Sequence, residues 1–192
     1  MALFFFCALK PGGESGINYK SPRVIIAGKI APGASVGAYY VKQYSEAIAD
    51  KLNFVPYPGT LNIKPVGSRD LKREFPLYLN YIKKSLNEKD CTFFDPDWEK
   101  FDIANLKEIK QDIYSIKPFK KDGNFFGSVI LIPIKLHIFH GSKAPGAGGE
   151  IHDCFIVIPE KAQNREIVEI LSGLNLKKEF NLKTGDSVLI FI

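Results

Sequence analysis

Short apolar runs, bounded by proline and glycine, recur along the chain and predict strands in preference to long helices. In PRVIIAGKI, residues 22–30, and HDCFIVIP, residues 152–159, the apolar residues are mostly β-branched. The same pattern predicts strands over Ala2–Leu9, Ala38–Val41, Leu61–Lys64, Phe125–Phe139 and Ser187–Ile192. Pro133 interrupts the longest of them, and because proline lacks a backbone N–H, it implies a sheet edge, a bulge or a break into two strands.

Helical spacing of apolar residues is less common. Tyr44, Ala47, Ile48 and Leu52 follow one another at i, i+3, i+4 and i+8, which predicts an amphipathic helix over Ser45–Leu52. Further helices are expected over Leu77–Leu86, from the N-cap Asp95 and Pro96 to about Gln111, and over Glu166–Leu171. The first two of these fall in a lysine-rich stretch between residues 67 and 122.

Many short strands, few helices and no regular alternation of strand and helix predict a mainly β (α+β) chain, either a β-barrel or an α+β fold. The 192 residues suit a single domain. We expect an N-terminal extension over residues 1–22 and a helical insertion over about 67–122, because strands resume after that stretch.

Composition changes this picture little. Hydrophobic residues make up 45% of the chain, enough for a core, and the formal net charge of +5 permits a nucleotide, a nucleic acid or an ordinary solvated surface. The lysines are scattered, so no groove for a polyanion is indicated. Cys7, Cys91 and Cys154 have no CxxC spacing, which favours neither a disulfide framework nor zinc and fits a reducing cytoplasm. ALFFFCAL, residues 2–9, is too short to span a membrane and has no basic residue before it.

Several common motifs are absent from the sequence. It has no GxxxxGK[ST], no GxGxxG that opens a helix and no GxSxG. His137, His140, His152 and Cys154 could build a metal site across a hairpin, but residues three apart on a strand point to opposite faces, so ordinary histidines are favoured. The loop Gly141–Glu150 could hold a phosphate, although a flexible hairpin tip is the simpler interpretation.

The stretch PYPGTLNIKP, residues 56–65, is typical of a tight turn that leads into a strand. Thr60 and Asn62 are two apart, so a hydroxyl and an amide oxygen project from the same face of that strand. They are either ordinary turn residues or the ligands of a bound group.

The order of several motifs resembles one known family. GKI (28–30), GAYYV (37–41) and NFVPYPGTLNIKP (53–65) are followed by FFGSVILIPIKL (125–136), IVIPE (156–160), EIVEIL (166–171) and LKKEFNLKTGDSVLI (176–190). This order is similar to the archaeal-type CTP-dependent riboflavin kinases over Arg23–Pro65 and Phe125–Ile192. The resemblance implies a closed six-stranded β-barrel of the cradle-loop type with short appended helices.

The resemblance also implies an activity and a site. Family members transfer the γ-phosphate of CTP to the 5′-hydroxyl of riboflavin, which gives FMN and CDP. Thr60 and Asn62 match the family's Mg²⁺ ligands, and Glu169, in the expected helix, matches a flavin-binding glutamate. The CTP-binding positions correspond to Ala34, Ser35, Val36, Gly37, Ala38 and Tyr39 in a first loop, and to Leu174, Asn175, Leu176 and Lys177 in a second. The resemblance names no general base.

This chain departs from the family pattern in two places. The family's GLGEGRYY reads GASVGAYY here, so Val36 and Ala38 replace an acidic and a basic residue. Ala162 stands near the position of a flavin-site threonine. Two alternatives therefore stay open: a diverged relative that binds a nucleotide or flavin without phosphorylating it, and a DNA-binding barrel. The expected partners are CTP and riboflavin, without a membrane, in the cytoplasm and in an undetermined oligomeric state.

Overall fold

The computed structural model describes residues 24–33, 36–67, 92–93, 113–138, 150–160 and 166–192. The strands are β1 (Val24–Ile30), β2 (Leu61–Pro65), β3 (Thr92–Phe93), β4 (Tyr114–Ile116), β5 (Phe119–Lys121), β6 (Asn124–Phe126), β7 (Val129–Ile138), β8 (Glu150–Pro159), β9 (Val168–Leu171) and β10 (Ser187–Phe191). Helices α1 (Val36–Leu52) and α5 (Leu176–Glu179) are also described.

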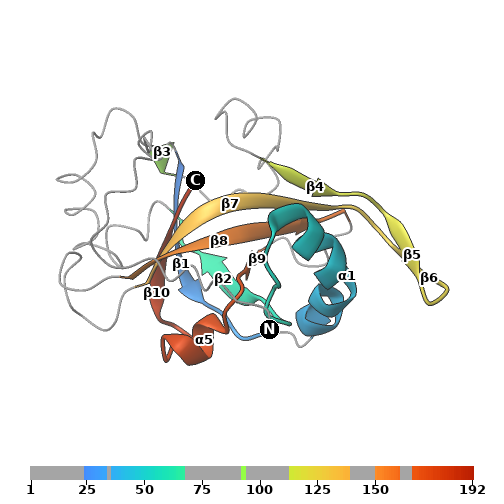
Figure 1. Cartoon of the computed structure of the whole chain (residues 1–192). Coiled ribbons are helices and arrows are strands. Elements are labelled where there is room, and N and C mark those ends of the chain that lie inside the picture. The colour runs from blue at the N-terminus through green and yellow to red at the C-terminus, as the bar shows by residue number, and fades with distance from the viewer. Residues whose placement is uncertain (1–23, 34–35, 68–91, 94–112, 139–149, 161–165) are drawn as a thin grey trace, which may run out of the picture.

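Six of the strands form a closed antiparallel barrel, which confirms the predicted architecture. Their order around the barrel is β1, β2, β9, β8, β7 and β10, and the pairing of β10 with both β7 and β1 closes the circle. Strand β3 adds to β1 in parallel, and β4 adds to β7. Strands β5 and β6 form a separate hairpin that projects from the barrel in Figure 1.

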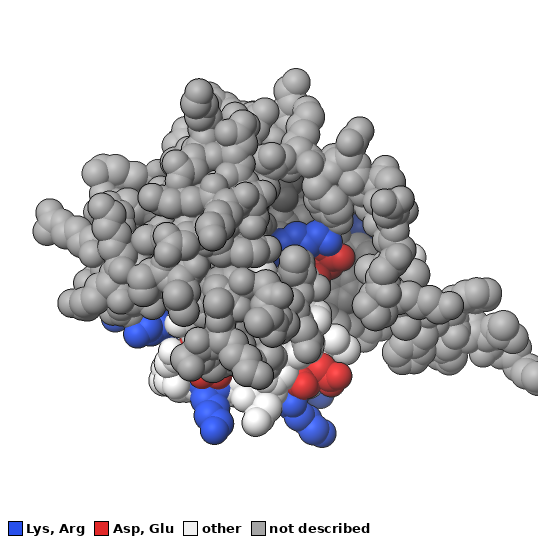
Figure 2. Space-filling view, turned by 90° about the vertical axis from the view of Figure 1, so that its left-hand side faces the viewer, with Lys and Arg blue, Asp and Glu red and all other residues white. Residues whose placement is uncertain are grey.

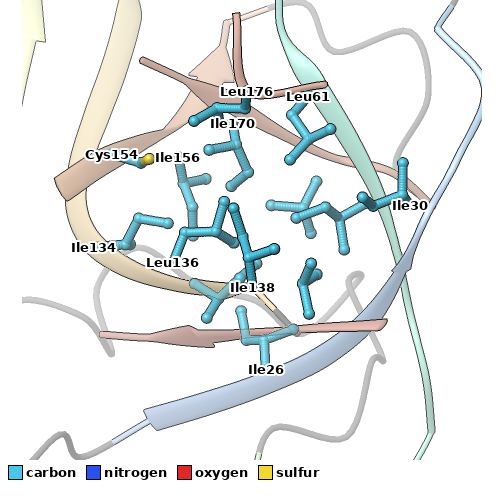
Figure 3. Close-up of a cluster of buried hydrophobic side chains, with 14 of the residues drawn as sticks. Ile26, Ile30, Leu61, Ile134, Leu136, Ile138, Cys154, Ile156, Ile170 and Leu176 are labelled. Carbon is cyan, nitrogen blue, oxygen red and sulfur yellow. The ribbon is translucent and has the colours of Figure 1, made fainter. Parts of the chain in front are cut away.

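Alternate residues of each barrel strand point inward, because the side-chain period of a strand is two. The inward residues are almost all branched and aliphatic, and those of the cluster drawn in Figure 3 include Ile26, Ile30, Leu61, Ile134, Leu136, Ile138, Ile156 and Ile170. Leu176 of α5 joins the same cluster. Burial of each such side chain contributes about 1.5–3 kcal/mol to the free energy of unfolding, so the core holds the barrel wall in place.

A second apolar cluster lies between α1 and the outside of the barrel. Val41, Tyr44 and Ile48 of the helix pack with Leu131 of β7 and Leu171 of β9. The Tyr44 hydroxyl donates a hydrogen bond of 2.7 Å to the carbonyl of Gly127, just before β7. This packing fixes α1 on the barrel and so determines where its N-terminus lies.

The expected strand over Ala38–Val41 is wrong, because these residues belong to α1. The helix begins at Val36 and includes the predicted segment Ser45–Leu52. Tyr39 and Tyr40 favour strands by propensity, but Val41, Tyr44 and Ile48 are spaced by three and four residues and form the buried side of one continuous helix.

The expected helix over Glu166–Leu171 is also wrong. Residues Val168–Leu171 form β9, which is paired with β2 on one side and β8 on the other. Val168 and Ile170 point into the barrel core, whereas Glu169 lies between them on the outer face. The segment is too short for its spacing to distinguish a helix from a strand, and the two neighbouring strands decide its conformation.

Pro133 lies within a continuous strand. On the side away from β8, β7 pairs with β4 at residues 129–131 and with β10 at residues 135–138. Pro133 falls between these two partners and is itself paired with Phe155 of β8, so the predicted break at this residue is wrong. The strand expected over residues 125–139 is interrupted earlier, between β6 and β7.

Of the other predicted elements, some are confirmed and the rest lie outside the described residues. Strands over residues 24–30, 61–64, 152–159 and 187–191 are confirmed. The strand expected over residues 2–9, the helices over 77–86 and 95–111, and the loop before Glu150 lie outside the described residues. Strands β4 and β5 fall within residues 67–122, so the expected helical character does not extend to the end of that stretch. The division into extension, barrel and insertion stays a prediction.

Candidate functional site

A cleft of about 560 Å³ lies on the outside of the barrel wall. Its lining comes from four separate parts of the chain: the start of α1, the turn into β2, strand β9 and the segment that leads into α5. The lining residues are Gly33, Gly37, Ala38, Tyr57, Pro58, Gly59, Thr60, Leu61, Asn62, Glu169, Ile170, Ser172, Leu174, Asn175, Leu176, Lys177 and Lys178.

Thr60 and Asn62 lie side by side in this cleft, as their spacing predicts. The Thr60 hydroxyl donates a hydrogen bond of 3.2 Å to Oδ1 of Asn62. Nδ2 of Asn62 donates to the carbonyl of Pro32 at 3.2 Å, so the amide oxygen is turned toward Thr60. With only 7% of its surface exposed, Asn62 is a buried polar residue whose orientation its neighbours determine.

This pair of oxygens suits a hard divalent cation. Octahedral Mg²⁺ binds oxygen at about 2.1 Å, which places neighbouring ligands roughly 3 Å apart. Thr60 Oγ1 and Asn62 Oδ1 are separated by 3.2 Å, and the hydroxyl proton can rotate away when a cation binds. The described residues contain no group of three or more His, Cys, Asp or Glu side chains that could hold a metal. Thr60 and Asn62 are both neutral, so a cation held by them would take its negative charge from a bound phosphate or from Glu169, the partner of Asn62 across the sheet.

The N-terminus of α1 lies against the oxygen pair, and Gly37 permits this approach. A Cβ atom at position 37 would lie 2.9 Å from Thr60 Oγ1, closer than real Cβ contacts allow. The first turn of a helix has backbone N–H groups without partners inside the helix, and these favour a bound anion. Gly37 and Ala38 line the cleft at this point.

Glu169 is the direct neighbour of Asn62 across the sheet. The register of β2 and β9 pairs the two residues, so their side chains lie on the same outer face of the barrel wall. Burial raises the pKa of the Glu169 carboxyl above its usual range. Among the described residues, it is the one acidic side chain that lines the cleft.

The opposite wall consists of residues 172–178. Asn175 is the N-cap of α5: its Oδ1 accepts a hydrogen bond from the backbone N–H of Lys178 at 3.2 Å. Its Nδ2 donates to the Tyr57 hydroxyl at 2.8 Å. The Lys177 ammonium donates to the carbonyl of Ala31 at 3.3 Å, which ties this wall to the end of β1. Lysine side chains thus bring positive charge to the cleft.

The structure therefore brings together many of the residues expected from the sequence. Gly37, Ala38, Thr60, Asn62, Glu169, Leu174, Asn175, Leu176 and Lys177 all line the cleft. Val36 and Tyr39 are about half exposed on α1, and neither belongs to the lining. Ala34, Ser35 and Ala162 lie outside the described residues, so their expected roles stay predictions.

Sequence reasoning missed Tyr57, Ser172 and Lys178. The Tyr57 backbone N–H donates to the carbonyl of Ser172 at 2.9 Å, which joins the two walls of the cleft. Two flanking prolines gave Tyr57 some prominence in PYPGTLN. Ser172 and Lys178 have no comparable signal, although Asn175 in front of α5 is an ordinary N-cap pattern.

The alternative histidine site is wrong for the residues that are described. Leu136 points into the barrel and pairs with His152, so His137 points outward while His152 and Cys154 point inward. Burial raises the pKa of Cys154 to about 12, and its thiol therefore stays protonated at neutral pH, unlike a metal-bound thiolate. His140 lies outside the described residues.

Neither described helix has the length and apolar character needed to cross a membrane.

Comparison with known proteins identifies this chain's relatives. Riboflavin kinase from Pyrococcus furiosus is 32% identical over 169 residues, which cover 88% of this chain and 58% of that protein. Riboflavin kinase from Thermoplasma acidophilum is 29% identical over 174 residues, 87% of this chain and 56% of that protein. The chain thus spans less than two thirds of the length of these relatives.

A family model extends this similarity across most of the chain. The model of the CTP-dependent riboflavin kinases, also described as a domain of unknown function, DUF120, matches residues 30–110 and 99–192. These ranges contain both walls of the cleft and the oxygen pair of Thr60 and Asn62. The chain therefore belongs to the family of CTP-dependent riboflavin kinases.

Proposed function

We propose that this protein is a kinase that transfers the γ-phosphate of CTP to the 5′-hydroxyl of riboflavin, with Mg²⁺, to give FMN and CDP. The observation that carries the proposal is the pairing of Asn62 with Glu169 in one cleft. A residue expected to hold the cation and a residue expected to hold the flavin thereby become neighbours. The reacting phosphate and hydroxyl need the same proximity.

The nucleotide phosphates would lie between the two walls of the cleft. Thr60 Oγ1 and Asn62 Oδ1 would hold Mg²⁺, which in phosphoryl transfer neutralises charge on the phosphates. The free N–H groups of the first turn of α1, at Gly37 and Ala38, would bind phosphate oxygens. Lys177 and Lys178 line the opposite wall and can supply the positive charge that Ala38 lacks relative to the family pattern.

Glu169 would orient the second substrate. Its carboxylate can accept hydrogen bonds from hydroxyl groups of the ribityl chain and hold the terminal hydroxyl beside the cation site. Phosphoryl transfer through a loose transition state depends mainly on positioning and on charge neutralisation, so a strong general base is not required. The chain's contribution is therefore chiefly alignment.

The first experiment is a chromatographic assay for FMN. Purified protein is incubated with riboflavin and Mg²⁺, and with CTP, ATP, GTP or UTP in parallel. We expect FMN with CTP and little with the other nucleotides. FMN from ATP alone would keep the reaction but contradict the choice of nucleotide, and no FMN from any of them, with folded protein, would contradict the kinase.

Two other functions are weaker candidates. The replacements at Val36 and Ala38 favour a relative that binds without transferring phosphate, and the assay above separates it from the kinase. A DNA-binding role needs a continuous basic face. In the view of Figure 2, acidic side chains lie next to lysines or arginines on the described surface, which offers it little support. A steep salt dependence of affinity for duplex DNA would favour that role instead.

A further inference from the structure

The Tyr57 side chain occupies an unusual position in the cleft. It lines the cleft at the turn before β2, and 37% of its surface is exposed. Its hydroxyl oxygen accepts the hydrogen bond from Nδ2 of Asn175 at 2.8 Å, across 118 positions of sequence.

The direction of that hydrogen bond follows from the chemistry of its two groups. An amide nitrogen has no acceptor capacity, so Asn175 must donate and Tyr57 must accept. The orientation of the amide is itself determined, because Oδ1 of Asn175 accepts from the Lys178 backbone. The proton of the Tyr57 hydroxyl must therefore point away from Asn175, and within the described part of the chain no acceptor takes it.

The tyrosine is also held rigidly. Its backbone N–H donates to the Ser172 carbonyl at 2.9 Å, and its carbonyl accepts from the N–H of Gly59 at 2.8 Å. Its ring lies so close to Gly59 that an added Cβ there would be 3.1 Å from Cε1. A donor held in this way loses little conformational freedom when it binds a ligand, which raises the net value of the bond.

We propose that the Tyr57 hydroxyl donates a hydrogen bond to an acceptor oxygen of the bound nucleotide, either a carbonyl of the base or an oxygen of the phosphates. The inference rests on the proposed function. The charges in the cleft favour the nucleotide over the flavin, because the Tyr57 hydroxyl is bonded to Asn175 of the opposite wall, which also carries Lys177 and Lys178. Glu169, the acceptor group, lies instead on β9 beside Asn62.

The direct test is the variant Tyr57→Phe, with CTP as the probe in isothermal titration calorimetry. Loss of one hydrogen bond corresponds to a roughly three- to tenfold weaker affinity for a neutral acceptor on the base, and to a loss of about tenfold or more for a charged phosphate oxygen. The matched control is Tyr40→Phe, because Tyr40 lies exposed on α1 and does not line the cleft. We expect this control to bind CTP like the wild type. Far-ultraviolet circular dichroism and thermal unfolding establish that both variants are folded.

Two further probes locate the acceptor. If Tyr57→Phe weakens the binding of inorganic triphosphate as well as CTP, the acceptor is a phosphate oxygen. If it weakens cytidine and CTP but leaves triphosphate unchanged, the acceptor is on the nucleoside. Either result supports the proposal. An equal loss for riboflavin and CTP would indicate a general disturbance of the cleft and would overturn it.

A second variant reverses the hydrogen bond while leaving the helix capped. In Asn175→Asp, one carboxylate oxygen can still cap Lys178, since Asp is a good N-cap, but the other can only accept. The Tyr57 hydroxyl would then donate its hydrogen bond to this carboxylate and would no longer be able to donate to the nucleotide. We therefore expect Tyr57→Phe to cause no further loss of CTP affinity in the Asn175→Asp background. Comparing the two backgrounds removes the direct effect of the added charge.

The outcomes separate this inference from the function on which it rests. Wild-type protein that binds no nucleotide would contradict the kinase itself and this role with it. Wild-type binding of CTP with an unchanged affinity in Tyr57→Phe would contradict only the role of Tyr57. A further possible result is that Tyr57→Phe weakens CTP binding as much in the Asn175→Asp background as in the wild type. That result would also overturn the proposal, because the loss of affinity would then not come from the hydrogen bond that the Tyr57 hydroxyl donates.

Discussion

At the scale of single residues, the orientation of the Asn62 amide determines where the proposed cation would bind. Pro32 holds its nitrogen and Thr60 contacts its oxygen, so the acceptor oxygen faces the cleft before any ligand arrives. Such an arrangement needs only a rotation of the Thr60 hydroxyl proton when a cation binds. It also explains why a neutral side chain can serve there, because the phosphates of the nucleotide supply the negative charge.

Substitution Asn62→Ala tests this directly. We expect the rate of Mg²⁺-dependent FMN formation to fall by about 100-fold or more, because a bound cation contributes several kcal/mol to stabilising the transition state. The assay uses saturating CTP and riboflavin over a range of Mg²⁺ concentrations. Denaturant unfolding of the variant establishes that the barrel persists. Turnover equal to that of the wild type would remove the cation assignment.

Tyr44 offers a prediction about pH. Burial, together with Tyr40 and Glu160, raises its pKa above the ordinary value of 10.0, so the folded state favours the protonated phenol. The stability that Tyr44 contributes is therefore present below pH 10 and is lost as pH rises through the folded pKa. Tyr44→Phe, which loses the hydrogen bond to Gly127, should lower the free energy of unfolding by about 1 kcal/mol near neutral pH.

Above pH 10 the difference between Tyr44→Phe and the wild type should shrink, since only the wild type must keep a phenol protonated. Urea unfolding at neutral and alkaline pH measures both values. Tyr39→Phe serves as the exposed control, because Tyr39 is about half exposed on α1 and is not among the groups that raise the pKa of Tyr44. A difference that stays constant or grows with pH would show that Tyr44 does not titrate in this way.

The residues of the site differ in how far the sequence can predict them. Thr60 and Asn62 are two apart on one strand, so their proximity follows from local geometry alone. Tyr57 and Asn175 are 118 positions apart, and the pairing of Asn62 with Glu169 depends on the register of two strands. Such contacts depend on tertiary structure, which the pattern of a single sequence does not specify.

At the scale of elements, the errors fall where local preference and tertiary packing disagree. Strands β8 and β10 are strongly apolar and were predicted correctly, whereas the strand expected over residues 125–139 is divided between β6 and β7. The start of α1 contains two adjacent tyrosines, which favour a strand, but its buried face against β7 makes it helical. Strand β9 has only four residues, and its conformation comes from β2 and β8 on either side.

The close approach of α1 to the oxygen pair leads to a prediction about Gly37. In Gly37→Ala the added Cβ would lie 2.9 Å from Thr60 Oγ1, so the helix or the threonine must move. Strain of this kind costs about 1–3 kcal/mol, and we expect FMN formation to fall by about tenfold or more. The matched control is Gly173→Ala: although Gly173 belongs to the segment of the opposite wall, it does not itself line the cleft, and its Cβ would have its nearest neighbour at 3.5 Å. Equal activity in the two variants would contradict the proposed packing.

At the scale of the whole molecule, the sequence pattern by itself predicted a β-rich chain, either a β-barrel or an α+β fold. The number of strands and the closure of the barrel came from the resemblance to a family. The order of the strands could not be deduced from the pattern, because β9 pairs with both β2 and β8, which lie far apart in the sequence. The hydrophobic effect is not directional and does not by itself specify which strands pair.

Closure predicts where substitutions will destabilise the molecule most. Ile190 of β10 is fully buried in the barrel core, and its strand joins β1 to β7. Ile190→Ala should lower the free energy of unfolding by about 2–5 kcal/mol. Phe125→Ala, at a position that is 64% exposed on the β5–β6 hairpin, should change it by less than about 0.5 kcal/mol. Urea titration compares them, and similar losses in both variants would contradict the described core.

The position of β10 has a consequence for biosynthesis. The ribosome makes β10 after all the other barrel strands, yet the barrel closes only when β10 pairs with β1 on one side and with β7 on the other. Until it emerges, the nascent polypeptide presents two unpaired edges, which can pair with other chains. Contacts between distant parts of a sequence also form slowly. Folding in the cell should therefore wait for the final strand, and chaperones that shield exposed edges should act on this protein throughout its translation.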